Sequence, residues 1–424
     1  MTLIFGSNGK PLANFVMALA SYSSARTPIE YSESPLYLYQ HSSIGKLFER
    51  LLKDIGSDVS IFEAQVQDFI SKYNPVKSGI IRTQLDTFPV YKPHSPTHPD
   101  RSAVYKPNLT IKGNKPVEIG YNISSFNQGF DTKWSIPLSM IRVPTEKSSI
   151  QIGVSQILTY LKNLDKTNSL VINSADSSYG NAQFISPLNG ESNLVNIVRL
   201  KNRNVYDYAP KTGTGGANTI YGNLYNLRRK DEKTKRKDPK TKLLVDAKPS
   251  VFEKQPDQTD AFIIQTTKGR KIKVELTLFR QMCMRSKKEF SMKHKTFDVL
   301  IVDYLDAQTL ESIHIKPIYL AICGQRKSEL SIKESYQNYD HRYDIEPNNR
   351  FIKHQLGLDK FQTPIQKHFD LYLSLIQLTE WLLLMASDEV ISTPKKWQKY
   401  NEIQQIDGQK LTIAQTRKSC QPFF

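Results

Sequence analysis

Cysteines and long apolar runs are scarce in this sequence. Its three cysteines, Cys283, Cys323 and Cys420, lie far apart in a chain of 424 residues. Their number and spacing fit neither a disulfide framework nor a zinc-binding pattern, so we expect a protein of a reducing cytoplasm. The most apolar stretch, residues 371–386, is interrupted by four polar side chains. It is also shorter than a membrane-spanning helix requires.

Acidic side chains are outnumbered by basic ones. The chain has 58 Lys and Arg residues against 41 Asp and Glu residues, which gives a net charge of +17. This imbalance predicts a polyanionic partner, with nucleic acid ahead of an anionic membrane surface. The main basic tract, residues 228–238, lacks the pattern of an amphipathic helix, which disfavours the membrane surface. Apolar residues make up 39% of the chain and aromatic residues 10%, so it is not a disordered protein.

Hydrophobic periodicity divides the chain into regions of different character. Apolar residues recur at three- and four-residue spacing over 44–55 and 59–73, which predicts helices. Alternating segments such as 271–278 and 296–303 predict strands. We therefore expect a helical region over 1–75, the first part of a mixed α/β core over 76–204, a β-rich insertion with a basic loop over 205–325, the second part of the core over 326–390, and a tail over 391–424. The helices of the first region fit a DNA-binding module and a packing lid equally well.

Two predicted strands end in an aspartate. The first begins at Ser78 and is closed by Asp86, and the proline-rich residues 88–100 follow it as an extended loop. Asp176 closes a second, buried strand. Active sites of α/β proteins lie at strand ends, where short side chains of neighbouring strands meet. Asp298 is a competing acid, but it lies within the predicted β-rich insertion.

Residues 339–353 carry four functional side chains at a fixed spacing. Tyr339, Arg342, Glu346 and Lys353 occur at offsets of 0, 3, 7 and 14. On one continuous helix these positions lie within roughly 60° of one another. That face then carries one carboxylate among three groups that bind phosphate, which suits a metal ligand beside a nucleic-acid backbone. A solvated helix face with intrahelical ion pairs is the alternative.

The spacing resembles the Tyr-(2)-Arg-(3)-Glu-(6)-Lys signature of bacterial DDE transposases of the insertion-sequence class, which move by cut-and-paste through DNA hairpins. Asp86 followed by Thr87 resembles the first catalytic aspartate of that family. The segment from Asp176 through a short helix to the strand 196–200 resembles the second. The resemblance covers roughly residues 78–385.

The resemblance implies an α/β fold with a ribonuclease-H-like mixed-sheet core, interrupted by a β-rich insertion and flanked by helical N-terminal and C-terminal regions. It also implies that Asp86, Asp176 and Glu346 are catalytic and bind two Mg²⁺ ions, for which Mn²⁺ substitutes. Carboxylate oxygens are the hard ligands that Mg²⁺ prefers. The side chains expected to contact DNA are Tyr339, Arg342, Arg350, Lys353, Arg228, Arg229 and Lys230.

The implied activity is cleavage at transposon ends and strand transfer into target DNA. The expected partner is double-stranded DNA, both as terminal repeats and as target. A homodimer is expected when two ends are bound. We expect a nucleoid-associated protein of the cytoplasm that does not engage a membrane.

Two departures from the family pattern leave alternatives open. Pro347 directly follows Glu346, which predicts a kink at the catalytic residue. No tryptophan lies in the β-rich insertion, so the candidates for stacking on a base are Phe262, Phe279 and Phe290. The sequence does not distinguish among the three. A ribonuclease-H-like nuclease that cuts without joining, and an inactive transposase-derived DNA-binding protein, are the other readings.

Overall fold

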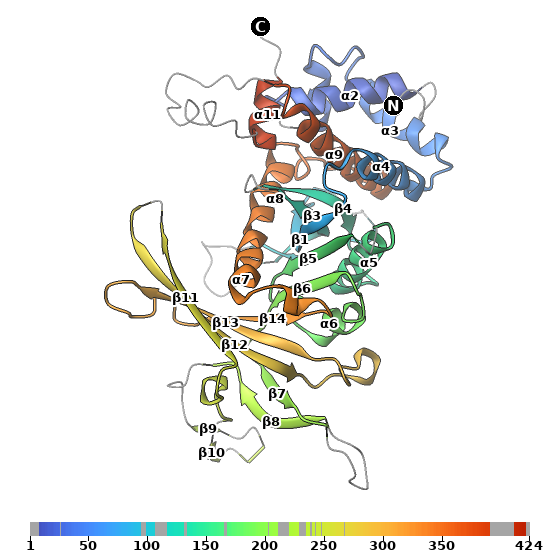
Figure 1. The fold of residues 1–424 in the computed structure, drawn as a ribbon. Helices are drawn as coiled ribbons and strands as arrows, with labels where there is room; N and C mark the ends of the chain where they lie inside the picture. Colours follow the sequence, from blue (N-terminus) through green and yellow to red (C-terminus); the bar gives the residue numbers. More distant parts are fainter. Residues whose placement is uncertain are drawn as a thin grey trace. The chain divides into compact units, whose positions relative to one another are not determined.

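The fold is mixed α/β, with a mixed sheet of twelve strands and helices towards both ends of the chain (Figure 1). This confirms the predicted class. The computed structural model describes residues 8–420 except 26, 95–98, 107–116, 131–133, 165–167, 202, 211–219, 229–234, 238–239, 242, 247, 267 and 391–410. The chain divides into two compact units, a first of residues 1–77, 84–156 and 343–424, and a second of residues 78–83 and 157–342.

The helices of the first unit surround one apolar helix, α9. They are α2 (Gly9–Ser21), η2 (Pro28–Glu33, a 3₁₀ helix), α3 (Ser42–Asp54), α4 (Val59–Tyr73), α8 (Ile345–His354), α9 (Gln366–Ala386) and α11 (Ile413–Ser419). Helices α2, α3, α4 and α11 all pack against α9 (Figure 1). The rings of Phe15 and Phe48 lie 5.9 Å apart, and both contact Tyr372 of α9. The N-terminal helices therefore share a core with α9, which favours the packing role over a detached module.

Helix α9 is, among the described residues, the one helix whose length and composition would allow it to cross a membrane. Most of its apolar window is buried inside the protein. Its polar residues Gln377 and Glu380 are buried as well, and the Gln377 amide donates to Leu138 O at 2.6 Å. Helix α9 thus has the contacts of a core helix.

The strands of the first unit are most of β1 (Gly79–Tyr91), with β2 (Ser102–Tyr105), β3 (Val117–Gly129) and β4 (Ser135–Arg142). Strand β3 pairs antiparallel with β2 through its first residues and with β4 through its later ones. The predicted end of the first strand at Asp86 is wrong, because β1 continues to Tyr91. Pro89 is accommodated because its neighbours keep the strand paired: the Lys92 amide, just beyond β1, donates to Ile119 O at 2.8 Å.

The second unit contains the rest of the sheet and a small two-stranded sheet. Its elements are the end of α5 (Ser149–Lys162), β5 (Ser169–Ala175), α6 (Ala182–Leu188), β6 (Leu194–Arg199), β7 (Asn204–Tyr208), β8 (Tyr221–Asn226), β9 (Lys235–Lys237), β10 (Leu244–Asp246), η3 (Val251–Glu253), β11 (Gln258–Gln265), β12 (Lys271–Cys283), η4 (Lys288–Phe290), β13 (Phe297–Asp306), β14 (Ile318–Cys323), η5 (Lys327–Glu329), α7 (Ile332–Asp340) and the first half of η6 (His341–Asp344). The strand order is β5-β6-β14-β13-β12-β7-β8, with the start of β1 next to β5. Strands β5 and β6 are parallel, and β14 pairs antiparallel with β6.

The β-rich segment after β6 extends the same sheet. Strand β14 pairs with β6 over Asn196–Arg199, and β13 and β12 continue the same sheet. Side chains of β5, β6, β12, β13 and β14 form one buried cluster with Ile332, Tyr336 and Tyr339 of α7. The alternating pattern predicted these strands, but their partners were set by tertiary contacts that periodicity does not contain.

The predicted continuous helix through residues 339–353 is also wrong. Helix α7 begins at Ile332, with a capping box formed by Ser331 and Glu334. It ends at Asp340, and the 3₁₀ helix η6 follows before α8 begins at Ile345. The boundary between the two units falls within η6, at residues 342 and 343.

Candidate active site

Asp86 lies within strand β1. Its side chain is half-buried, and Oδ1 accepts a hydrogen bond from the Thr87 amide at 2.8 Å. The flanking residues Leu85 and Phe88 are 0% and 5% exposed. Burial on both sides fixes the backbone here, so the first unit presents this carboxylate from a rigid element.

Glu346 is the second residue of α8 and is exposed. A carboxylate in the first turn interacts favourably with the helix dipole. The kink expected at Pro347 does not occur at this residue, because Pro347 occupies the third position of α8. Amides of a first turn have no partner within the helix, so the proline forfeits no hydrogen bond. The interruption lies upstream, in η6.

Helix α8 contacts the strand that carries Asp86. The Lys353 ammonium lies over the ring of Phe88, with Nζ 5.9 Å from the ring centroid. Lys353 is seven residues after Glu346, which is close to two helical turns. Phe88 is two residues after Asp86 on β1. Burial lowers the pKa of Lys353, an effect that Asp359 opposes.

Trp134 holds the buried side of α8, a role that the sequence did not reveal. The indole Nε1–H donates to Asn348 Oδ1 at 3.1 Å. The ring also meets Phe351 edge-on, with centroids 5.8 Å apart. Asn348 is 0% exposed and lies two residues after Glu346. The orientation of α8, and with it that of Glu346, therefore depends on contacts made just before β4.

The second unit holds Asp176, which directly follows β5 as predicted. Its Oδ1 accepts from the amide and the hydroxyl of Ser178 at 2.8 and 2.5 Å. Two residues earlier, the Ser174 hydroxyl donates to Asn338 O at 2.9 Å. Asn338 precedes Tyr339, so the second unit brings the end of β5 next to the end of α7.

Tyr339 and Arg342 are buried in the second unit, at 2% and 7% exposed. The Arg342 guanidinium lies 5.9 Å from the centroid of the Tyr339 ring. The four side chains predicted to share one helix face are thus divided between the units. Tyr339 and Arg342 belong to the second unit, and Glu346 and Lys353 belong to the first. Contact of these side chains with DNA phosphate stays a prediction.

The predicted metal ligands are likewise divided, with Asp86 and Glu346 in the first unit and Asp176 in the second. Among the described residues, no group of three or more His, Cys, Asp or Glu side chains is arranged to hold a metal ion. Within the first unit the donors fit Mg²⁺ in kind, since both are carboxylates with access to solvent. Convergence of all three carboxylates stays a prediction.

The remaining basic residues of the predicted DNA interface differ in setting. Arg350 is exposed on α8. Arg228 is partly buried, and its guanidinium donates to Lys248 O at 2.7 Å, which ties it to the loop before η3. Arg229 and Lys230 lie outside the described residues.

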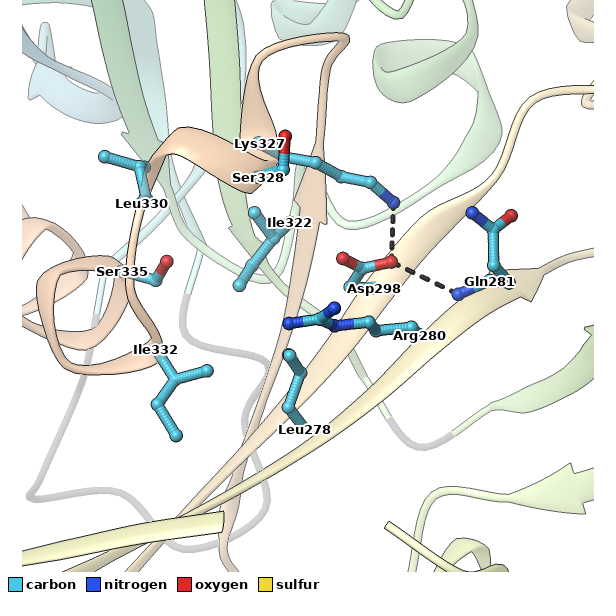
Figure 2. Close-up of a pocket in the computed structure, with 10 residues that line it drawn as sticks. All are labelled: Leu278, Arg280, Gln281, Asp298, Ile322, Lys327, Ser328, Leu330, Ile332 and Ser335. Atoms are coloured by element: carbon cyan, nitrogen blue, oxygen red, sulfur yellow. Dashed lines mark hydrogen bonds and ion pairs between the residues drawn. The ribbon is translucent and has the colours of Figure 1, made fainter. Parts of the chain in front are cut away.

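The competing acid Asp298 has a structural role in the second unit. It lines a pocket of about 170 Å³ next to Lys327 and Gln281 (Figure 2). Its Oδ1 accepts from Lys327 Nζ at 2.5 Å and from the Gln281 amide at 3.2 Å. Gln281 has a φ of 54°, where the pairing of β12 with β13 shifts register. Asp298 therefore fixes an irregular point of β12 and is neutralised by a lysine, which makes it a poor metal ligand.

No protein-family model matches this chain, and no curated protein matches it in sequence.

Proposed function

We propose that this protein is a DDE-type DNA transposase that cleaves transposon ends and transfers the cut strand into target DNA. The observation that carries the proposal is the contact between Lys353 and Phe88 in the first unit. Through it, the helix that bears Glu346 packs against the strand that bears Asp86. The first unit thus carries two oxygen donors with solvent access and a half-buried cation, groups that suit chemistry on a phosphodiester.

The order of elements supports a ribonuclease-H-like core. Apart from the short edge strand β2, three strands, β1, β3 and β4, precede helix α5, and β5, α6 and β6 follow. The first aspartate lies on the first of these strands, and Asp176 follows the strand after α5. This is the succession that the resemblance to the transposases implies, with the third carboxylate on a helix after the β-rich segment.

In the proposed reaction the chain's own residues have distinct roles. Asp86, Asp176 and Glu346 would hold two Mg²⁺ ions, which supply an activated nucleophile and stabilise the leaving oxygen when bound. Lys353 would offer its ammonium to a DNA phosphate near Glu346, because charge-assisted contacts position a backbone. The buried face of α8 would keep both side chains in a constant orientation.

The test is cleavage of DNA that carries the ends of the chain's own element, with Mg²⁺ present. Asp86→Asn, Asp176→Asn and Glu346→Gln should each lower cleavage and joining on the order of 10²-fold or more. Full activity in any of the three variants would remove that residue from the site. Cleavage without joined products would favour the nuclease, and metal-independent binding without cleavage would favour the inactive DNA-binding protein.

Matched controls separate chemistry from local structure. Asp260 in β11 accepts from the next amide at 2.8 Å, as Asp86 does. Asp260→Asn therefore measures the effect of losing a strand aspartate outside the proposed site. Asp58 accepts from the amide and hydroxyl of Ser60, two residues on, in the manner of Asp176. Asp58→Asn therefore measures the effect of changing an aspartate with the same local hydrogen bonds outside the proposed site. Both control variants should cleave at the wild-type rate.

A further inference from the structure

Glu380 is a carboxylic acid buried in the apolar helix α9. It is 0% exposed, and neither of its oxygens makes a hydrogen bond with another described residue. Burial raises the pKa of Glu380 well above its ordinary value, and the Asn348 amide opposes this rise. Burial therefore favours the uncharged form of this side chain. An apolar residue would be less costly at such a position, so the acid needs an explanation.

The neighbour of Glu380 on α8 is Asn348, which is also 0% exposed. Its Oδ1 is occupied by the Trp134 indole, whereas its Nδ2 has no hydrogen-bond partner among the described residues. This amide nitrogen needs an acceptor, and a carboxyl oxygen of Glu380 is the acceptor next to it. No hydrogen bond of normal geometry joins the two side chains in the structure, so a small shift or one bridging water would complete the pair.

Helix α9 is a fixed reference for this contact. One turn before Glu380, the Gln377 amide donates to Leu138 O at 2.6 Å. One residue after it, the Trp381 indole donates to Pro137 O at 2.8 Å. Both bonds anchor α9 to β4 on either side of Glu380. The carboxyl group thus occupies a defined position towards α8.

We propose that Glu380 is a positioning residue which, through Asn348, fixes the rotation of α8 and hence the direction in which Glu346 points. Its consequence for DNA cleavage rests on the proposed function, whereas its effect on α8 does not. Trp134 donates to the oxygen of the Asn348 amide, and in this proposal Glu380 accepts from its nitrogen. Glu346 lies two residues earlier on the same helix. A rotation of α8 about its axis would move Glu346 with it.

The test compares Glu380→Gln with Glu380→Leu in the full-length protein. Glutamine keeps a carbonyl oxygen towards Asn348, and leucine removes it at similar volume. The first readout is the indole N–H resonance of Trp134 in protein labelled with ¹⁵N-tryptophan, assigned with Trp134→Phe. We expect E380L to shift this resonance and to speed its exchange with water at least tenfold, whereas E380Q leaves exchange within twofold of wild type.

The second readout is Mg²⁺-dependent cleavage per folded molecule. E380L should lose at least tenfold and E380Q less than twofold. Thr379→Val is the control, since Thr379 is buried on α9 but bonds only within it, to Leu375 O at 2.7 Å. If E380L does not fold, Glu380→Met replaces it, because an unbranched side chain fills irregular space.

The outcomes separate this inference from the proposed function. An unchanged Trp134 resonance in the leucine or methionine variant would overturn the positioning role, and so would equal damage from E380Q. A wild-type protein that does not cleave DNA, but whose Trp134 resonance responds to E380L as expected, would refute the transposase proposal and leave the positioning role intact. If the wild-type protein cleaves DNA and E380L changes neither readout, the positioning role is refuted and the transposase proposal stands.

Discussion

Pro347 offers a quantitative test of how α8 begins. In a helix interior, proline costs about 3 kcal/mol, because it removes a hydrogen bond and its ring clashes with a carbonyl of the preceding turn. At the third position of α8 the amide has no helical partner, so most of this cost is absent. Replacing Pro347 with alanine also gives freedom to the unfolded chain, which destabilises by about 0.4–1 kcal/mol. We therefore expect Pro347→Ala to lower the free energy of unfolding by less than about 1 kcal/mol.

The matched variant is Arg350→Pro, at an exposed position one turn further along α8. There the new proline removes an interior hydrogen bond, so we expect a loss of about 3 kcal/mol or more. Urea titration followed by circular dichroism measures both variants. If Pro347→Ala were to stabilise the protein by about 2 kcal/mol, Pro347 would be a strained kink and the account of α8 would be refuted.

Three further predictions concern the buried charges. Arg142→Ala should cost about 3–5 kcal/mol in urea titration, since Arg142 pairs with two aspartates in the first unit. The control is Arg270→Ala, at an exposed arginine that pairs with Asp306; it should cost below about 1 kcal/mol, and equal losses would contradict this. Burial raises the pKa of Glu63 from 4.5 to about 7, so the folded state binds its proton more tightly and stability falls as pH rises through that window. Glu63→Gln should remove about 2 kcal/mol of that fall, allowing for partial exposure, and identical pH profiles would refute it. Asp298→Ala should cost about 2 kcal/mol, because it leaves Lys327 without its partner, and a neutral result would show that the pair is not needed.

Local signals in the sequence located some of the elements that carry the candidate active site. The apolar run before Asp176 located β5 where the structure has it. The end of β1 was missed because Pro89 indicates a loop, although Phe88 and Val90 continue the buried pattern of a strand. Proline breaks a strand only where its missing amide is needed by the ladder.

The contacts that support α8 could not be predicted, because each joins residues far apart in the chain. Trp134 meets Asn348 across 214 positions, and no spacing rule connects them. Glu380 did carry a signal, as a lone acid in an apolar helix, but the sequence alone reads it as an interruption of that helix. The break in the signature helix was hidden for a similar reason: offsets of three, seven and fourteen describe a face only if the helix is continuous.

The central claim is that Asp86, Asp176 and Glu346 act on one metal site. The most direct measurement is a crystal structure of the protein soaked with Mn²⁺, with anomalous diffraction recorded at the manganese absorption edge. We expect an anomalous peak bound by carboxylate oxygens of all three residues. A well-ordered structure in which the three carboxylates point apart, with manganese bound elsewhere, would contradict the account.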